Sequence, residues 1–453
     1  MHARQNIIVV GAGLVGSLLA IYLAKKGYTV AVFDKNADPQ ETHSAPSKSS
    51  INLTLCERGF NALAEVGLDG VIRDMTLPIY GRLIHNIHGE TTFQHYGTNN
   101  QALYSILRDD LNNALLRFAR QNFDIDFHFN EKCLGIDLVH ATPSFSNLRS
   151  GAVSHQPARI VFGADGAFST IRLQLQKTDR FNYSQQYMAY GYRELTIPAE
   201  QGTGWLAEKS AIHFWPRGHY MLMGFANTDG SFTLSLHMPF KGAISFEAIQ
   251  TEQDLLDLFE QSFPDVLPRM PTLLEHYFAR PTNSMITIRC SPWTFQDKVA
   301  LIGDSAHAIV PYYGQGANAG FEDCAILNRC MDQYGEDWGM IFSEYERLRK
   351  QNTDMIADLA LHNFVELSDQ VADPRFQLRK TIERRVSIRY PEKYSSLYSM
   401  IAFSSMPYIE ALHVDQQRRV FIDQIMCIEG IEARDDQAID CIIDALMQTS
   451  SSL

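Results

Sequence analysis

The sequence lacks a basic tract, a paired-cysteine motif and an internal repeat. Its 39 Lys and Arg stand against 52 Asp and Glu, which gives a formal net charge of -13 at pH 7. Phosphate binding depends on clustered cations, so a nucleic-acid partner is not expected. The seven cysteines are scattered and never spaced as CxxC, a pattern that favours reduced cytoplasmic thiols over a disulfide framework or a zinc site. We therefore expect a cytoplasmic protein without a metal ion.

Long apolar runs are also scarce. The run Ile7–Ala24 is uncharged for 18 residues, which is the lower limit of a membrane-spanning helix. Gly11, Gly13 and Gly16 interrupt it, and a strand, a glycine turn and a helix explain it better than one lipid-facing helix. A signal or an anchor is the lesser alternative, and we expect no membrane attachment.

Apolar residues nevertheless make up 45% of the chain and aromatic residues 11%, which is enough for a large core. The length of 453 residues suggests about three domains. A helical pattern over Leu14–Lys26 lies between strand patterns at Asn6–Val10 and Tyr28–Asp34. This order predicts a βαβ unit at the start of the chain.

A second region, from Gln185 to Phe240, alternates apolar and polar residues and is rich in aromatics. It predicts a mostly antiparallel sheet with one covered face. After Met340 the apolar residues follow helical spacing. The strands expected in the sheet are Gly191–Ile197, Ala211–Pro216, Tyr220–Phe225 and Ser231–Met238.

The glycines of the first turn form GxGxxG, with Gly11, Gly13 and Gly16 placed between a strand and a helix. The first permits a tight turn, the second lets the backbone approach a pyrophosphate, and the third lets helix and strand pack closely. Asp34 ends the next strand, where a carboxylate would accept hydrogen bonds from an adenosine ribose. Dinucleotide binding is the favoured interpretation, and a purely structural glycine turn is the alternative.

Two further motifs follow buried strands. Ile160–Gly163 leads into Asp165 and Gly166, and Val299–Ile302 leads into Gly303 and Asp304. A glycine-rich segment, Gly314–Gly320, comes soon after. With the first turn, these motifs resemble the three fingerprints of the single-component FAD-dependent aromatic hydroxylases, the p-hydroxybenzoate hydroxylase class.

Longer strings narrow the resemblance to the branch of that class that acts on L-kynurenine, over residues 5–405. The resemblance implies hydroxylation to 3-hydroxy-L-kynurenine with FAD, NADPH and O2 through a C4a-hydroperoxyflavin, in tryptophan catabolism and NAD biosynthesis. The flavin would carry the chemistry, so no catalytic side-chain acid or base is expected. The strings are Ser50–Leu53, Tyr96–Thr98, Phe181–Tyr187, His307–Tyr313 and Gly314–Cys324.

The resemblance also assigns cofactor contacts. Asp304 would hold the ribityl chain, and it could equally cap a helix. Backbone amides of Ala317 and Asn318, at a helix N-terminus, would meet the negative edge of the reduced flavin. The full expected set is Gly11, Gly13, Val15, Gly16, Asp34, Lys35, Thr54, Arg108, Cys133, Asp165, Asp304, Gly316, Ala317 and Asn318. No second nucleotide fingerprint indicates where NADPH docks.

The expected substrate is an amino acid, whose carboxylate suits the planar fork of an arginine. The family pattern puts this role on Arg82, assisted by the Tyr96 hydroxyl. Asn363 and Tyr398 would complete the polar end. Glu366 lies at i+3 from Asn363 and could meet the ammonium group. For each residue taken singly, a structural hydrogen bond is an equal alternative.

Three departures from the family pattern bear on the substrate. Lys48-Ser49 replaces a Gly-Arg pair, Tyr80 stands where a second arginine is common, and Tyr312 replaces a phenylalanine beside the substrate ring. The tyrosine could change ring stacking or add a hydrogen bond. Each departure leaves the substrate preference open.

Together these features predict an α/β flavoprotein with a Rossmann-like FAD-binding domain of the p-hydroxybenzoate hydroxylase type. We expect a discontinuous FAD domain (residues 1–75, 101–178 and 285–345), a substrate-binding sheet domain (76–100 and 179–284) and a C-terminal helical region (346–453). Two alternatives remain: a flavin hydroxylase for another aromatic acid, and a non-catalytic escort protein of the Rab GDP-dissociation-inhibitor type. A purified yellow protein would exclude the second.

Overall fold

The structure is a computed structural model that describes residues 6–41, 51–98, 100–199, 208–367 and 373–449. Its contacts divide the chain into two compact units. Unit 1 comprises Met1–Thr76, Ile106–Met188 and Ser284–Ala360, and unit 2 comprises Leu77–Ser105, Ala189–Asn283 and Leu361–Leu453. The Lys48-Ser49 departure lies outside the described residues.

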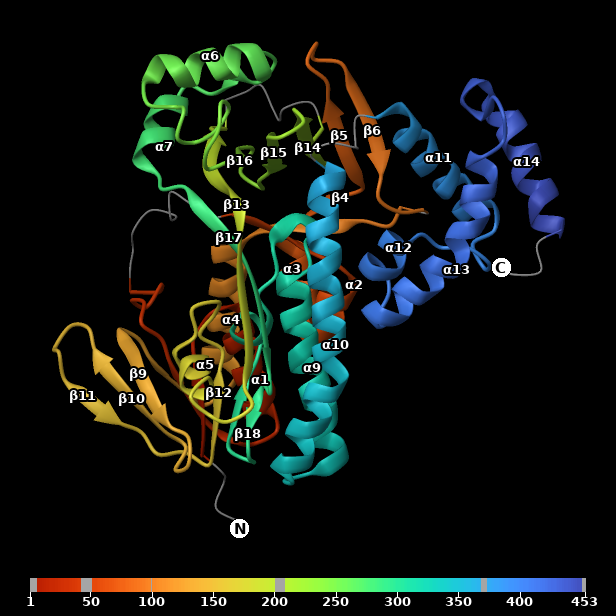
Figure 1. The fold of residues 1–453 in the computed structure, drawn as a ribbon. Coiled ribbons are helices and arrows are strands. Elements are labelled where there is room, and N and C mark those ends of the chain that lie inside the picture. Colours follow the sequence, from red (N-terminus) through yellow and green to blue (C-terminus); the bar gives the residue numbers. More distant parts are fainter. Residues whose placement is uncertain (1–5, 42–50, 99, 200–207, 368–372, 450–453) are drawn as a thin grey trace. The chain divides into compact units, whose positions relative to one another are not determined.

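Unit 1 is built on a six-stranded sheet of order β18-β19-β12-β1-β2-β8. Figure 1 labels β12 and β18 of this sheet. Strand β1 pairs in parallel with β2 and β12, and β12 pairs in parallel with β19. All but the first residue of β1 are buried, as expected for a parallel sheet covered on both faces. The elements of the sheet and its connections are β1 (Asn6–Val10), α1 (Leu14–Lys25), β2 (Thr29–Phe33), β8 (Ile125–His128), β12 (Ile160–Gly163), β18 (Thr294–Phe295) and β19 (Val299–Leu301).

The helices of unit 1 pack around this sheet, with α1 against α4 and α9, and α2 against α9. A three-stranded antiparallel sheet, β11-β10-β9, is added between β8 and β12. The remaining elements are β3 (Asn52–Leu55), α2 (Glu57–Glu65), α3 (Asp69–Asp74), α4 (Arg108–Asn122), β9 (Glu131–Asp137), β10 (Thr142–Asn147), β11 (Val153–His155), α5 (Thr170–Leu175), α8 (Asp304–His307) and α9 (Gly316–Tyr334).

A seven-stranded sheet of order β17-β13-β16-β15-β14-β5-β6 supplies the core of unit 2. Its pairs are antiparallel from β13 to β14, and β14 pairs with β5 in parallel. Side chains such as Trp215 pack with Phe259 and Tyr277 of the helices α6 and α7. The strands and helices are β4 (Leu77–Ile79), β5 (Gly81–His85), β6 (Thr91–His95), β14 (Ala211–Pro216), β15 (Met221–Ala226), β16 (Phe232–Pro239), α6 (Glu252–Ser262) and α7 (Leu273–Ala279).

Four elements contain residues of both units: β7 (Leu103–Leu107), β13 (Asn182–Ile197), β17 (Asn283–Ser291) and α10 (Trp338–Val365). The predicted mostly antiparallel sheet is confirmed. One prediction was too short, because β13 begins at Asn182 rather than at Gly191. Its first six residues are exposed, so they lack the apolar alternation on which the prediction rested.

The C-terminal helices of unit 2 form their own small core, which includes Ile382, Phe421 and Ile443. The basic side chains of α11 face acidic side chains of α13 and α14. Arg379 pairs with Asp423 at 2.7 Å, and Arg385 pairs with Asp440 at 2.6 Å. The helices are α11 (Pro374–Arg389), α12 (Leu397–Ala402), α13 (Tyr408–Met426) and α14 (Asp436–Thr449).

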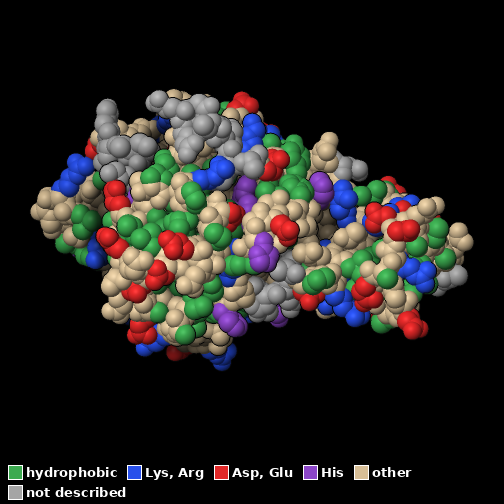
Figure 2. Space-filling model, turned by 90° about the horizontal axis from the view of Figure 1, so that it is seen from above, with side chains coloured by type: hydrophobic (Ala, Val, Ile, Leu, Met, Phe, Trp, Pro, Cys, Tyr) green, Lys and Arg blue, Asp and Glu red, His purple; other side chains and the backbone are tan. Residues whose placement is uncertain are grey.

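The surface carries both signs of charge. Figure 2 shows acidic and basic side chains interspersed on the face that it presents. Among the described residues, no helix combines the length and the apolar character needed to cross a bilayer.

Candidate functional site

The first turn of unit 1 needs two of its glycines for steric reasons. Gly11 has φ +110°, and a Cβ there would lie 2.3 Å from the carbonyl oxygen of Ala164. A Cβ on Gly16 would lie 1.9 Å from the carbonyl oxygen of Gly11. Gly13 is different, since a Cβ there would meet nothing within 4 Å. The space beside Gly13, at the N-terminus of the 12-residue helix α1, fits an anion such as a pyrophosphate.

Asp34 follows β2 and braces this turn. Its Oδ2 atom accepts a hydrogen bond from the Ala12 N–H at 2.7 Å, and its Oδ1 atom accepts one from the Asn36 N–H at 2.7 Å. Lys35 beside it is exposed. The carboxylate therefore has a structural role in addition to the predicted ligand contact, and each oxygen keeps a lone pair for a ribose hydroxyl.

Asp165 follows β12, and one of its oxygens has no donor. Its Oδ2 atom accepts hydrogen bonds from the N–H groups of Thr170 at 2.7 Å and Ile171 at 3.3 Å. The Oδ1 atom is buried and receives no hydrogen bond from the described residues. Burial raises the pKa of Asp165, and burial together with the Asp165 charge raises the pKa of Cys133 to about 12. A buried acceptor without a donor fits a ligand that brings hydroxyl or N–H groups.

The Gly303–Asp304 turn meets the first turn through Val15. Gly303 has φ +64°, and a Cβ there would lie 3.0 Å from Val15 Cγ2. A Cβ on Gly320 would lie 2.5 Å from the same methyl group. Val15 therefore packs against glycines of both later motifs, and the fold brings together motifs that lie about 300 residues apart in the chain.

Asp304 is exposed, whereas Gly303 and the three residues after Asp304 are buried. Partial loss of solvent around the carboxylate raises the pKa of Asp304, while the charge of Arg108 opposes the increase. No described residue donates a hydrogen bond to it. Asp304 and Arg108 thus offer a carboxylate and a guanidinium to a bound polar molecule.

The N-terminus of α9 is fixed by Asn318. Its Nδ2 atom donates to the carbonyl oxygens of Thr54 and Gly314, both at 2.8 Å, and its Oδ1 atom accepts from the Cys56 N–H at 3.0 Å. The side chain is therefore occupied by protein, while the N–H groups of the first turn, Gly316–Asn318, have no acceptor within the helix. Such a terminus suits a negatively charged ring edge.

A second group of predicted residues lies in unit 2. Arg82 on β5 is buried, and it donates from Nε to Gln94 and from Nη2 to Glu366 Oε1 at 3.4 Å. No described residue accepts a hydrogen bond from Nη1. The terminal nitrogens can therefore still receive a carboxylate. Gln94 was not predicted, and its position opposite Arg82 in the β5–β6 pair was the signal that could have found it.

Two tyrosines stack in the same unit. The rings of Tyr96 and Tyr398 lie 5.0 Å apart between centroids, at 20°. Burial raises the pKa of Tyr96 to about 12, against the opposing charge of Arg82, so its hydroxyl stays protonated and can donate. Asn363 lies near the end of α10, and Glu366 follows that helix.

Tyr312 belongs to unit 1, where it is buried in the short 3-10 helix Pro311–Tyr313. Its place beside a substrate ring stays a prediction. Among the described residues, no cluster of His, Cys, Asp and Glu has the form of a metal site.

Comparison with known proteins identifies the family. A family profile described as "FAD binding domain" matches residues 4–339. The kynurenine 3-monooxygenase of Christiangramia forsetii is 43% identical over 435 residues, which cover 96% of each chain. That of Flavobacterium psychrophilum is 44% identical over 432 residues, covering 95% of this chain and 96% of its own. The chain belongs to the kynurenine 3-monooxygenase family. The Dictyostelium discoideum kynurenine 3-monooxygenase, at 36% identity over 455 residues, extends this family relationship to a eukaryote.

Solved structures confirm the fold class of this kynurenine 3-monooxygenase family member. The tetrameric form of 2-methyl-3-hydroxypyridine-5-carboxylic acid oxygenase has a TM-score of 0.65 at 20% identity, covering 83% of this chain and 96% of that one. PqsL of Pseudomonas aeruginosa has a TM-score of 0.64 at 16% identity, and the match covers 81% of this chain and 97% of PqsL. The predicted FAD cofactor is likewise confirmed by the family, and the residues of unit 1 described above fit it.

Proposed function

We propose that this chain hydroxylates L-kynurenine to 3-hydroxy-L-kynurenine, with NADPH and O2 as co-substrates. The observation that carries the proposal is its extensive identity with kynurenine 3-monooxygenases. The buried Arg82 guanidinium, whose Nη1 atom has no acceptor among the described residues, supports it, because the substrate carries a carboxylate.

The cofactor would be held by the residues of unit 1. Gly13 and the start of α1 would receive the pyrophosphate, Asp34 and Asp165 would accept hydrogen bonds from the adenosine side, and Asp304 would hold the ribityl chain. Bound FAD would accept two electrons from NADPH and then activate O2. One oxygen atom would enter the aromatic ring, and the other would leave as water. The remaining predicted contacts are Gly11, Val15, Gly16, Lys35, Thr54, Arg108, Cys133, Gly316, Ala317 and Asn318.

The substrate would be oriented by residues of unit 2. Arg82 would bind its carboxylate through Nη1 and Nη2, and the Tyr96 hydroxyl would donate a second contact. Glu366, which faces Arg82, would meet the ammonium group, and Asn363 and Tyr398 would complete the polar end. This arrangement positions the ring without any side-chain acid or base. The proposed location is the cytoplasm, as the cysteine pattern suggests.

The decisive test is mass spectrometry of L-kynurenine after aerobic incubation with the purified protein and NADPH in 18O2. A product heavier by one 18O atom would support the proposal. Unchanged kynurenine with a bound flavin would instead favour the alternative, a hydroxylase for another aromatic acid. A panel of aromatic acids tested for substrate-dependent NADPH oxidation would then identify the substrate.

A matched compound isolates the role of the amino-acid end. 2-Aminoacetophenone keeps the aminophenyl ketone but lacks the carboxylate and the ammonium group. The parent protein should prefer L-kynurenine strongly in kcat/KM, and Arg82→Ala should remove most of that preference. An undiminished preference in the variant would assign carboxylate binding to another residue.

A further inference from the structure

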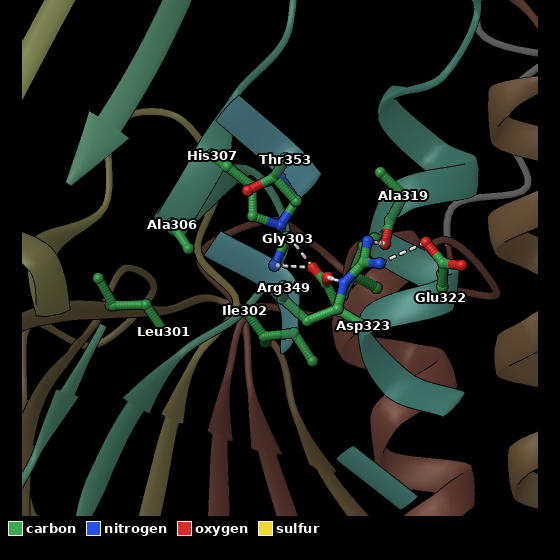
Figure 3. A network of polar contacts seen from close by, with 12 residues as sticks. Leu301, Ile302, Gly303, Ala306, His307, Ala319, Glu322, Asp323, Arg349 and Thr353 are labelled. Carbon is green, nitrogen blue, oxygen red and sulfur yellow. Dashed lines mark hydrogen bonds and ion pairs between the residues drawn. The ribbon is translucent and has the colours of Figure 1, made fainter. Parts of the chain in front are cut away.

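A completely buried carboxylate lies at the centre of a polar network in unit 1 (Figure 3). Asp323, in the second turn of α9, has no exposed surface. Its Oδ2 atom accepts hydrogen bonds from the Gly303 N–H at 3.2 Å and from His307 Nε2 at 2.6 Å, and its Oδ1 atom accepts one from Arg349 Nε at 2.6 Å. All three partners are donors.

Two of these donors flank Asp304. Gly303 precedes Asp304, and His307 ends the four-residue helix α8 (Asp304–His307). Asp323 therefore accepts a hydrogen bond from each end of the segment that presents the Asp304 carboxylate. Because Asp323 is part of α9, the same residue ties this segment to the helix whose N-terminus is Gly316.

The charge of Asp323 is balanced from the neighbouring helix. Arg349 on α10 also donates to the Ala319 carbonyl oxygen at 3.1 Å and pairs with Glu322, which in turn pairs with Arg58 of α2. Two arginines thus face two carboxylates. The buried His307 Nδ1 has no hydrogen-bond partner among the described residues, so the ring meets the protein's polar groups only through Nε2, at Asp323.

The ionised state of Asp323 is maintained by these contacts. Burial alone would raise its pKa, but the attraction of His307 and Arg349 and their hydrogen bonds outweigh it, and the pKa of Asp323 is lowered. The carboxylate can then accept from all three donors at once, which a neutral amide cannot do.

We propose that Asp323 is a positioning residue for the flavin. It holds the Gly303–His307 segment in register with α9, so that Asp304 and the α9 N-terminus act on one cofactor. The inference rests on the proposed roles of Asp304 and α9 in FAD binding, and it extends them to a residue that does not itself touch the cofactor.

The test compares two adjacent substitutions on α9. Asp323→Asn replaces the carboxylate that binds the segment by an amide. The amide N–H₂ then faces at least one of the three donors Gly303, His307 and Arg349. Glu322→Gln also removes a largely buried carboxylate paired with Arg349, but Glu322 has no contact with Gly303 or His307. It is therefore the matched control for loss of charge and of stability.

The readout is the rate at which diluted holoenzyme releases FAD, followed by the fluorescence of the freed flavin and without any substrate. D323N should release FAD about tenfold faster than the parent, as expected for loss of a charge-assisted hydrogen bond, while E322Q should stay within about threefold. The proposal would also be supported if D323N were purified folded but without flavin while E322Q retained its flavin. Equal rates in the two variants would overturn the proposal. Because no kynurenine is present, failure of the proposed hydroxylation leaves this test unaffected.

A second variant keeps the proposal testable if D323N does not fold. His307→Leu removes one of the two donors from the segment and keeps the Asp323 carboxyl group and its contacts with Gly303 and Arg349. It should accelerate FAD release about threefold, as expected for loss of one hydrogen bond. An H307L holoenzyme that releases FAD at the parent rate would overturn the proposal.

Discussion

Gln94 accepts a hydrogen bond from the Nε atom of Arg82, its partner across the β5–β6 pair. This contact fixes the plane of the guanidinium and leaves Nη1, together with the Nη2 atom that reaches Glu366 at 3.4 Å, for an incoming carboxylate. The strand pair, rather than a loop, therefore sets the direction from which the substrate would be bound.

Arg82→Ala should raise KM for L-kynurenine about a hundredfold, because loss of a bidentate charge-assisted pair costs roughly 2–3 kcal/mol. Arg82→Lys keeps the charge without the fork and should fall between the parent and the alanine variant. Initial rates of NADPH oxidation give KM. The visible absorbance of the purified variant gives the amount of bound flavin. Loss of flavin in either variant would contradict a substrate role for Arg82.

The glycines of the first turn provide a matched pair. Gly13→Ala should leave the fold intact, since its methyl group would meet no protein atom within 4 Å, but it should weaken FAD binding by filling the space next to the pyrophosphate. Gly16→Ala should destabilise the fold itself by roughly 1–3 kcal/mol through overpacking. Thermal unfolding and FAD release measured on both variants separate the two effects. Normal FAD release from G13A would mean that the anion lies elsewhere.

Asp304→Ala should yield folded protein without flavin, because the carboxylate has no structural hydrogen bond among the described residues that its removal could break. Asp304→Asn keeps the size and one acceptor and should retain part of the flavin. The ratio of absorbance of flavin to protein measures both. A fully yellow alanine variant would count against ribityl binding by Asp304.

His237 makes the fold sensitive to acid. It is buried on β16, and burial lowers its pKa from 6.5 to about 3. Below about pH 6.5 the imidazole is therefore protonated in the unfolded chain but stays neutral in the folded chain. The free energy of unfolding falls as pH falls, by up to about 1.4 kcal/mol per pH unit.

The measurement is Tm as a function of pH for the parent and for His237→Phe. The Tm of the variant should fall less than that of the parent from about pH 7 to about pH 5, because the unfolded variant lacks the imidazole that takes up a proton in this range. Above pH 7 the two curves should run parallel, because the imidazole is then neutral in both states. Identical slopes below pH 6 would show that another group dominates the acid response.

The sequence predicted those parts of the fold that depend on local pattern. The predicted strand at Asn6–Val10 coincides with β1, and the predicted strand at Ala211–Pro216 coincides with β14. Glycines marked the three nucleotide motifs, because crowding at Gly11, Gly16 and Gly320 and the positive φ of Gly303 leave little choice but glycine there. The predicted domain boundaries and the roles of the site residues stay predictions.

The contacts that join the motifs could not be predicted in this way. Asp323 and Arg349 lie on different helices, 26 residues apart in the chain, and each looks like an ordinary polar residue in its own segment. Their meeting in the core depends on how α9 packs beside α10. Asp34 shows a related limit, because its fingerprint position suggested a ligand contact and gave no sign that it also accepts the Ala12 N–H.

The strand order of the six-stranded sheet has a consequence for biosynthesis. β1 leaves the ribosome before its sheet partners β12 and β19, which lie about 150 and 290 positions further along the chain. Asp304 and α9 come later still, ending at Tyr334. At about 5–20 residues per second, translation takes on the order of half a minute to supply them. A nascent chain would thus display its pyrophosphate turn long before it could retain a flavin, and cofactor loading would be a late event in its maturation.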